Sequence, residues 1–392
     1  MNEQIEIYLD HVAAAPVRPE VAEAMTPLLT EGFGNPQSVH SRGQRAAEVL
    51  AEARERVAAL VGVGAQDVIF TATGTEANNM ALKGIAAGRA SKSKRIVISA
   101  VEHHSIMQPA RALEKEGYEL IVLPVDSFGR VDPSALKDAL AGGAAVVSII
   151  HASTEIGTIQ PIAELAAICA GAKVPLHTDA WGTAGMIPVD FAALGVSAMT
   201  IAGQNFGGPP GAAALILGKG FPLRAIMQGG VQERNLRPGQ ENLPAIAGMG
   251  LAAELSSKDM AERADAMRPI RDAFIERLPK RIPDVIVTGH PTERLPGHAS
   301  FCVKYIEGEG MLLFLDMQGI RAASGSACTS RALKGSHVLE ALGLDAATAQ
   351  GSIQFTLGPS NGPEDVDTVI ETMEPIIQRL REMSPIYKKK SN

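Results

Sequence analysis

The chain has 392 residues, of which 46% are hydrophobic and 20% are charged, and these proportions exclude a disordered or fibrous protein. Its formal net charge of -7 disfavours a general nucleic-acid surface, which needs an excess of lysine and arginine, so no nucleic-acid partner is expected. No apolar segment reaches the roughly 20 residues of a membrane-spanning helix, and the start "MNEQIEIYLDH" lacks a signal-peptide pattern, so we expect a cytoplasmic protein without a membrane partner.

The pattern from about residue 45 to 255 alternates between amphipathic helices and short apolar segments rich in Val and Ile. Such alternation is typical of a mainly parallel sheet that helices cover on both faces. We therefore predict an α/β fold with a mainly parallel seven-stranded sheet. The predicted strands lie within residues 68–74, 95–104, 118–124, 144–153 and 174–180, and a strand, loop and strand follow over 197–217.

A second unit follows a long predicted helix over residues 243–282. Its pattern predicts three strands, an intervening helix and a final helix, which together form a smaller α+β unit, and the N-terminal strand is expected to join it. The chain is longer than the size at which one hydrophobic core stops growing. We predict a large domain of residues 16–260 and a small domain formed by residues 1–15 and 261–392.

Ligands bind beyond the carboxyl ends of the strands in an open parallel sheet, so the residues after each strand are candidates for a site. Gly74 and Thr75 follow the first strand and precede a helix, where backbone N–H groups, the helix dipole and a hydroxyl could hold a phosphate. A Gly/Thr turn at such a place is also common as a plain helix cap. The residues alone leave both interpretations open.

His103 and His104 follow the second strand, and either ring could stack on an aromatic ligand, transfer protons or have a structural role. Paired histidines also suggest zinc, but no further ligand lies at a familiar spacing, so no metal site is predicted. Asp179 ends another predicted strand. Its carboxylate could keep a ring nitrogen protonated, as a pyridine-type electron sink requires, or it could cap the next helix.

Three cysteines are too few for a disulfide framework in a chain of this length, and they fit a reducing compartment. Cys169 and Cys302 lie in apolar segments and are predicted to be buried. Cys328 lies in "AASGSACTSRALKG", a small and polar segment in which Arg331 and Lys334 follow it. Because nearby cations favour the thiolate, Cys328 is predicted to be a reactive thiol that moves sulfur between a donor and an acceptor.

Ordered motifs along nearly the whole chain carry a family resemblance. They include "IYLDHVAAAPV", "ATGTEANNMALKG", "VEHHSI", "HTDAWGTAGMIPVD", "GGVQERNLRPGQEN" and "ASGSACTS". In these motifs the chain closely resembles the cysteine desulfurases of the class V aminotransferase group, in the branch that serves iron–sulfur cluster assembly. The resemblance implies a homodimeric fold-type-I pyridoxal phosphate (PLP) enzyme with active sites near the subunit interface. It also implies a sulfur-acceptor or iron–sulfur scaffold protein as partner.

The resemblance further implies roles for individual residues. In this family a lysine binds PLP covalently, and a mobile cysteine attacks the substrate sulfur to leave alanine and a persulfide. Cys328 matches that nucleophile, Asp179 matches the partner of the ring nitrogen, and His103 matches the stacking acid/base. Gly74 and Thr75 match the phosphate-binding turn.

The family's Ser-Gly-His-Lys motif is replaced in this chain. Ala202 and Gln204 stand where the family has its phosphate-binding Ser and His, and Asn205 stands where it has the lysine. The amide nitrogen of asparagine cannot form the imine, because its lone pair is delocalised. Gln204 and Asn205 therefore lie in the turn that binds the cofactor in the family, but Asn205 cannot form the covalent link to the cofactor.

Further changes surround the same predicted site. Family residues that contact the cofactor, the substrate or the neighbouring subunit are replaced by Thr154, Gly182, Gln240, Gln354 and Pro359. Each lost charge-assisted hydrogen bond is worth about 1.5–3 kcal/mol, so these losses and the missing covalent link would remove most of the affinity for PLP. We infer that the pocket has diverged from the family.

Two hypotheses keep the chemistry of the family in part. The first is a sulfur-handling protein in which Cys328 accepts, holds or delivers sulfur, or ligates a cluster on a partner scaffold, while the usual PLP cycle is lost or altered. The second is a cysteine desulfurase that holds PLP non-covalently through Thr75, His103 and Asp179.

Two further hypotheses depart from the family. One is new chemistry on a thiol or anionic substrate, with Cys328 as nucleophile and His103 as base in a cavity that Trp181 and Phe206 help to shape. The other is a purely structural partner of an active paralogue. That last hypothesis predicts hetero-oligomers and no dependence on Cys328.

Overall fold

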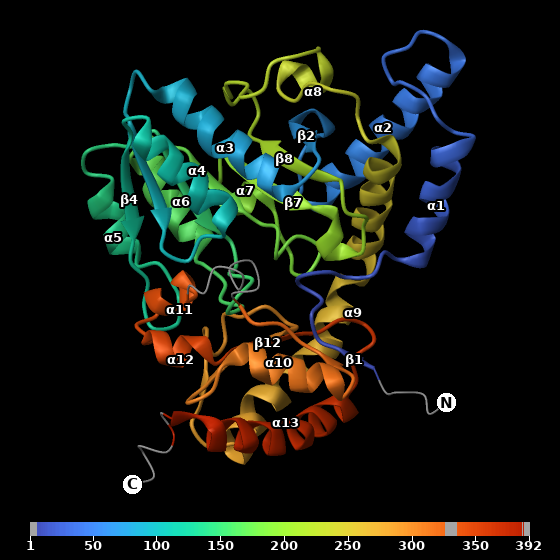
Figure 1. The fold of residues 1–392 in the computed structure, drawn as a ribbon. Coiled ribbons are helices and arrows are strands. Elements are labelled where there is room, and N and C mark those ends of the chain that lie inside the picture. The colour runs from blue at the N-terminus through green and yellow to red at the C-terminus, as the bar shows by residue number, and fades with distance from the viewer. Residues whose placement is uncertain (1–5, 326–334, 386, 388–392) are drawn as a thin grey trace.

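The computed structural model describes residues 6–325, 335–385 and 387 (Figure 1). Its largest element is a seven-stranded sheet of strand order β2-β8-β7-β6-β5-β3-β4. The strands are β2 (Val68–Thr71), β3 (Arg95–Ser99), β4 (Glu119–Leu123), β5 (Val146–Ile150), β6 (Leu176–Asp179), β7 (Ala198–Ala202) and β8 (Ala213–Leu217). β8 runs antiparallel to β2 and β7, and all other neighbours are parallel. The predicted α/β fold with a mainly parallel seven-stranded sheet is therefore confirmed.

Helices cover both faces of this sheet, and each face has its own apolar cluster. In β3, Ile96 and Ile98 belong to one cluster and Val97 to the other, because successive residues of a strand point to opposite faces. Helices α3 (Gly74–Arg89) and α4 (His104–Lys115) cover the first face, and the second is covered by α1 (Pro19–Thr30), α2 (Ser41–Leu60), α5 (Pro133–Ala139), α6 (Ile162–Gly171) and α7 (Phe191–Leu194). Burial on both faces explains why these strands are almost continuous apolar runs.

A smaller unit contains a three-stranded antiparallel sheet of order β12-β10-β9. Its elements are β9 (Val285–Val287), β10 (His298–Val303), α10 (Gly308–Met317), α11 (His337–Ala341), α12 (Ala346–Gln350), β12 (Ser352–Thr356) and α13 (Pro363–Met383). Strand β1 (Ile7–Tyr8) pairs in parallel with β11 (Ile320–Arg321), so the start of the described chain packs with this unit. Phe274, Phe301 and Phe355 are fully buried in its core.

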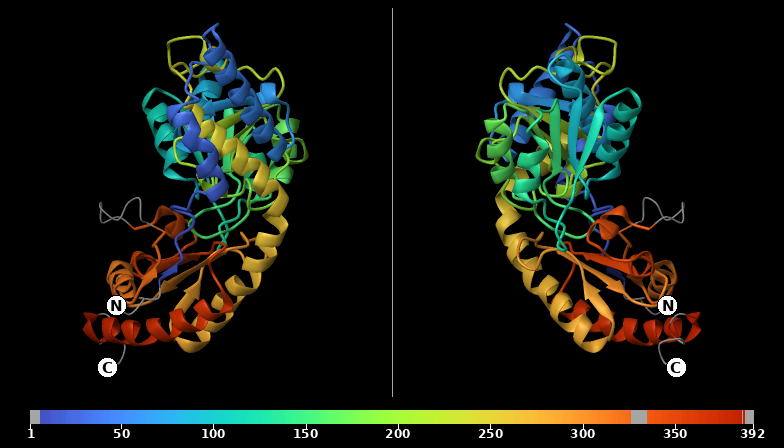
Figure 2. Two further views of the ribbon diagram at one scale, coloured as in Figure 1. Left: turned by 90° about the vertical axis from the view of Figure 1, so that its right-hand side faces the viewer. Right: turned by 90° about the vertical axis from the view of Figure 1, so that its left-hand side faces the viewer.

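Helix α9 (Leu243–Arg281) runs from the large sheet into the small unit, as Figure 2 shows from two sides. Ala245 and Ala253 belong to the apolar cluster of the large sheet, whereas Met267 and Leu278 belong to that of the small unit. The helix passes residue 260 without a break, so the division into two domains at that residue stays a prediction. Among the described helices, none combines the length and apolar character needed to cross a membrane.

The loops after the parallel strands lie where the two units meet. The N–H of Ile159, beyond the end of β5, donates to the carbonyl of Glu293 at 2.9 Å, and the N–H of Leu295 donates to the carbonyl of Gly157 at 2.9 Å. These bonds hold the carboxyl edge of the sheet against the small unit. This edge is where an open parallel sheet binds ligands.

Candidate functional site

A cavity of about 420 Å³ lies at the carboxyl edge of the large sheet, between that sheet and the small unit. It is lined by residues that follow β2, β3, β5, β6 and β7 and by residues of the small unit. The cavity brings together the predicted site residues Gly74, Thr75, His103, Asp179 and Gln204. Cys328, Arg331 and Lys334 lie outside the described residues.

The start of helix α3 forms one wall of this cavity. Thr73 is the N-cap, and its hydroxyl accepts a hydrogen bond from the N–H of Glu76 at 3.1 Å. The Glu76 carboxylate in turn pairs with Arg237 at 2.8 Å. These contacts are typical of a capped helix start, which still leaves Gly74 and Thr75 on the cavity wall. Their role in binding phosphate stays a prediction.

A chain of hydrogen bonds connects Asp179 to His103. The Asn78 amide donates to Asp179 Oδ2 at 2.7 Å and to Ser105 Oγ at 2.8 Å, and Ser105 Oγ lies 2.7 Å from His103 Nδ1. The other Asp179 oxygen accepts from the N–H of Trp181 at 3.0 Å. No helix begins directly after Asp179 in the described chain, so the helix-cap interpretation is wrong.

Burial shifts the pKa values of the two residues at the ends of this series of hydrogen bonds, Asp179 and His103. It raises the pKa of Asp179, although the hydrogen bonds from Asn78 and Trp181 and the charge of His103 act in the opposite direction. It lowers the pKa of His103 despite the nearby carboxylate, and an exposed part of this residue faces the cavity. The backbone N–H of Ser105 donates to His103 Nδ1 at 3.1 Å, so the neutral ring carries its proton on Nε2.

Two further carboxyl groups line the cavity, and the sequence reasoning did not identify them. Glu102 is fully buried, and its Oε1 accepts from Ser99 Oγ at 2.6 Å and from the N–H of Ile150 at 2.8 Å. Glu155 accepts a hydrogen bond from Ser336 Oγ. Burial raises the pKa of Glu102 to about 8 and that of Glu155 to about 8. Their position in the loops that follow the apolar strands β3 and β5 was the signal that could have identified both residues.

Asn205 lies in a 3₁₀ turn (Gly203–Phe206) that follows β7. Its side chain is buried with 8% exposure, and within the described chain its Nδ2 has no hydrogen-bond partner. Gln204 lines the cavity, whereas Asn205 is not among the residues that line it. The residue at the family's lysine position is therefore present beside the cavity but does not reach into it.

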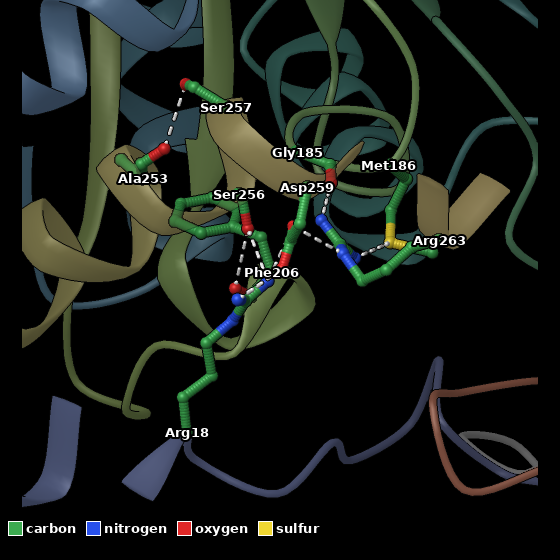
Figure 3. A network of polar contacts seen from close by, with 9 residues as sticks. All are labelled: Arg18, Gly185, Met186, Phe206, Ala253, Ser256, Ser257, Asp259 and Arg263. Carbon is green, nitrogen blue, oxygen red and sulfur yellow. Dashed lines mark hydrogen bonds and ion pairs between the residues drawn. The ribbon is translucent and has the colours of Figure 1, made fainter. Parts of the chain in front are cut away.

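The turn that carries Asn205 is held against helix α9 by the network in Figure 3. Ser256 Oγ donates to the carbonyl of Phe206 at 3.0 Å, and the backbone N–H of Arg18 donates to the carbonyl of Gly207 at 3.0 Å. The Arg18 guanidinium binds the Asp259 carboxylate at 2.6 and 3.1 Å. The long helix that joins the two units thus also positions the turn at the cavity.

We expect Ser256→Ala to lower the free energy of unfolding by about 1–2 kcal/mol, because it leaves the buried Phe206 carbonyl without this donor. Ser257→Ala is the matched control, since within the described part of the chain its hydroxyl bonds only to the carbonyl of Ala253 in the same helix, at 2.9 Å. That control should change stability by less than about 0.5 kcal/mol. Urea unfolding of both variants measures the difference, and equal losses would show that the turn does not depend on this bond.

Three of the replaced family residues, Thr154, Gly182 and Gln354, are packed against one another. A Cβ atom on Gly182 would lie 2.9 Å from Thr154 Cγ2, so Thr154 leaves no room for a larger residue at position 182. The buried Gln354 amide, in the orientation that satisfies it, donates to the carbonyls of Thr154 and Glu155 at 3.2 Å each. Gln240 and Pro359 are exposed. Thr154, Gly182 and Gln354 therefore form one part of the cavity wall, in which each residue fits against its neighbours.

Cys169 and Cys302 are buried, with 1% and 0% exposure, which confirms the prediction for both. Burial raises the pKa of each thiol to about 12. Neither side chain is therefore available as a thiolate near neutral pH.

The described residues fit PLP only in part. Asp179 could hold a protonated ring nitrogen, and His103 lies on the same cavity. However, no lysine or arginine is among the described residues that line the cavity. A Cβ atom on Gly74 would lie 3.0 Å from Trp181 Cδ1, so the indole lies against the turn that was predicted to bind phosphate. The cavity thus does not fit PLP in the covalently bound form that the resemblance implies.

Comparison with known proteins shows the family. The family described as aminotransferase class-V matches residues 7–369. Cysteine desulfurase IscS of Dictyoglomus turgidum is 45% identical over 380 residues, which cover 97% of this chain and 96% of that protein. Cysteine desulfurase IscS 1 of Archaeoglobus fulgidus is 44% identical over 382 residues, covering 97% of this chain and 100% of that protein.

Solved structures agree with these sequence matches. A structure described as a NifS-like protein has a TM-score of 0.89 at 30% identity, and the match covers 96% of this chain and 100% of the other. A NifS-like protein from Rickettsia africae has a TM-score of 0.86 at 31% identity, covering 95% and 100%. The fold-type-I PLP-transferase-like fold is thereby confirmed. The chain belongs to the class-V aminotransferase family and is a homologue of the cysteine desulfurases.

Proposed function

We propose that this protein handles sulfur through Cys328 and does not run a PLP cycle that depends on a lysine. The observation that carries the proposal is Asn205, which is buried at the family's lysine position beside the cavity. An asparagine amide offers no nucleophilic nitrogen. The segment "SGSACTS" keeps its cysteine, and the names of the homologues support sulfur as the element that is handled.

Sulfur would pass through Cys328 in two exchange steps. The Cys328 thiolate attacks the outer sulfur of a persulfide donor, R–S–SH. The S–S bond of the donor breaks, a new S–S bond forms on Cys328, and R–S⁻ leaves, so no separate oxidant is needed. A thiolate of the acceptor protein then takes the outer sulfur and releases Cys328. Because thiolates also ligate iron–sulfur clusters, a scaffold protein that carries a cluster is the expected partner.

Cys328→Ser is expected to abolish sulfur uptake. The parent protein, incubated with glutathione persulfide, should gain the mass of one sulfur on the peptide that contains Cys328. Cys169→Ser is the control, because Cys169 is buried, and it should take up sulfur like the parent. Uptake by the Cys328→Ser variant at the rate of the parent would reject the proposal.

A second candidate is a cysteine desulfurase that holds PLP non-covalently, supplying a ring that accepts electrons from the bound amino acid. The hydrogen-bonded chain from Asp179 through Asn78 and Ser105 to His103 favours it. Absorption spectra during a PLP titration, run in parallel on Asn205→Lys, separate the two candidates. A saturable shift in the parent, with alanine formation that Asp179→Ala removes, would put this candidate first. No shift in the parent would leave sulfur transfer at Cys328 as the function.

The homodimer is also part of the proposal, and it rests on the family resemblance. Sedimentation equilibrium should then give twice the chain mass of 41.1 kDa. A mass of one chain at micromolar concentration would contradict it. The cytoplasmic location stays a prediction.

A further inference from the structure

The start of helix α3 has two backbone N–H groups that a ligand could use. The hydroxyl and the carbonyl of Thr73 accept the N–H groups of Glu76 and Ala77, both at 3.1 Å. The N–H groups of Gly74 and Thr75 precede these in the first turn, where the helix itself offers no acceptor. Backbone N–H groups at such a position commonly bind phosphate. Whatever lies beside them therefore decides which ligands can reach them.

The side chain of Trp181 lies against this helix start, and both line the cavity. A Cβ atom on Gly74 would lie 3.0 Å from Trp181 Cδ1 and 3.7 Å from Trp181 Nε1, so the five-membered ring of the indole faces this residue. Because the Cα–Cβ bonds of a helix tilt toward its N-terminus, a group at this place lies beside the first turn. A phosphate oxygen bound there would need to lie about 2.9 Å from the backbone nitrogens. The indole and a phosphate thus compete for the same space.

The loop that carries Trp181 is held by hydrogen bonds on both sides of this residue. The N–H of Ala180 donates to the carbonyl of Thr200 at 2.9 Å, and the N–H of Trp181 donates to Asp179 Oδ1 at 3.0 Å. After Trp181, the N–H of Ala184 donates to the carbonyl of Ala180 at 3.0 Å and closes a tight turn. These bonds fix the backbone at Trp181, and so they hold the indole at the start of α3.

We propose that Trp181 determines the ligand class of the cavity by keeping phosphate groups away from the start of α3. A phosphate ester then gains no affinity from the N–H groups of Gly74 and Thr75 over the same compound without its phosphate. This selectivity goes beyond sulfur transfer and does not rest on Cys328. It opposes the second candidate function, because that candidate holds PLP through Thr75.

Pyridoxine and pyridoxine phosphate test the proposal. They share one ring and differ by the phosphate, and neither has the aldehyde that would react with surface lysines. Their binding to the full chain at pH 7 is measured by isothermal titration calorimetry for the parent and for Trp181→Ala. Loss of the indole changes the contacts of both ligands, whereas only the phosphate ester can use the freed N–H groups. Trp181→Ala should therefore tighten pyridoxine phosphate, relative to pyridoxine, about tenfold, as expected of one charge-assisted hydrogen bond.

A second substitution shows where the phosphate binds. Gly74→Pro, made in addition to Trp181→Ala, removes the N–H of the first helical residue, a position at which proline is well tolerated. The extended backbone of Thr73, with φ -149° and ψ 157°, is compatible with a following proline. This double variant should lose most of the gain in phosphate affinity. It should still bind pyridoxine like Trp181→Ala, which also reports that the cavity is folded.

Phe128→Ala is the control, because this exposed ring is not among the described residues that line the cavity, and it should bind both ligands like the parent. If circular dichroism shows that Trp181→Ala does not fold, Trp181→Leu shortens the same side chain and should give the gain in its place. No measurable gain for the phosphate ester, or a gain that Gly74→Pro leaves unchanged, would overturn the proposal. Weaker binding of the phosphate ester alone would mean that the indole N–H donates to the phosphate, which also contradicts it. Neither ligand carries sulfur, so the outcome is independent of the sulfur-uptake test on Cys328.

Discussion

Replacement of Glu233 by alanine is expected to lower the free energy of unfolding by about 3–5 kcal/mol. The buried Glu233 carboxylate pairs with the Arg54 guanidinium at 2.5 and 2.8 Å and accepts the N–H of Phe70 at 2.8 Å. Arg54 also lies over the Phe70 ring, 4.6 Å from its centroid. Loss of the carboxylate would leave a guanidinium and a strand N–H without their partner at the edge of the large sheet. Urea unfolding followed by circular dichroism measures the loss.

Backbone strain does not affect the comparison of Glu233→Ala with the parent protein. Glu233 has a φ of 45° and Arg234 a φ of 59°, so both lie in the left-handed region, and alanine at position 233 has the same steric strain as glutamate. Glu254→Ala is the control, since Glu254 pairs with Arg56 at 3.0 Å and with Lys258 at the surface of α9. That variant should lose less than about 1 kcal/mol. A similar loss in both variants would mean that the buried pair contributes no more than an exposed one.

Glu102→Gln is expected to change how stability depends on pH. Burial raises the pKa of Glu102 from an ordinary 4.5 to about 8 in the folded protein, so between these values unfolding releases a proton. The stability that this protonated carboxyl contributes is complete below pH 4.5 and is lost as the pH rises through about 8. Relative to Glu102→Gln, which carries no such proton, the parent should lose about 1.4 kcal/mol per pH unit in this range.

The measurement is the difference in unfolding free energy between the parent and Glu102→Gln at pH 5.5, 6.5 and 7.5. Burial lowers the pKa of His151 to about 4 and of His177 to about 3, and these histidines act equally in both proteins, so they cancel in the difference. Glu254→Gln is the control, because the bond from Lys258 lowers the pKa of Glu254 and keeps it ionised in this range. A constant difference for Glu102→Gln would show that this carboxyl ionises as freely in the fold as in the unfolded chain.

The strands and the long helix could be predicted well because their signals are local. The apolar run of residues 144–153 contains β5 (Val146–Ile150), and the helix predicted over 243–282 is found as Leu243–Arg281. Both patterns depend on the order of apolar residues within one segment. Parallel strands then place their carboxyl ends at one edge, which is why Gly74, His103 and Asp179 were predicted to share a site.

Other residues of the site could not be identified in this way. Asn78 and Ser105 lie inside helices α3 and α4, where a polar residue usually faces water, and only the packing of both helices on the sheet turns them toward Asp179. Asn205 was predicted as part of the cofactor-binding turn, yet it is not among the residues that line the cavity. The position of Trp181 on Gly74 likewise depends on two strands that are distant in the chain.

The sequence by itself determined the α/β architecture, the edge of the sheet at which the cavity lies, and the absence of a lysine at position 205. Only the tertiary structure decided which polar groups meet and which carboxyl groups have a pKa that burial raises. Asn78 binds Asp179 across 101 residues of sequence, and Ser336 binds Glu155 across 181. The periodicity of apolar residues indicates how one segment is buried. The pKa values and hydrogen-bond partners of a group depend instead on every segment that packs around it, and those segments come together only when the chain is folded.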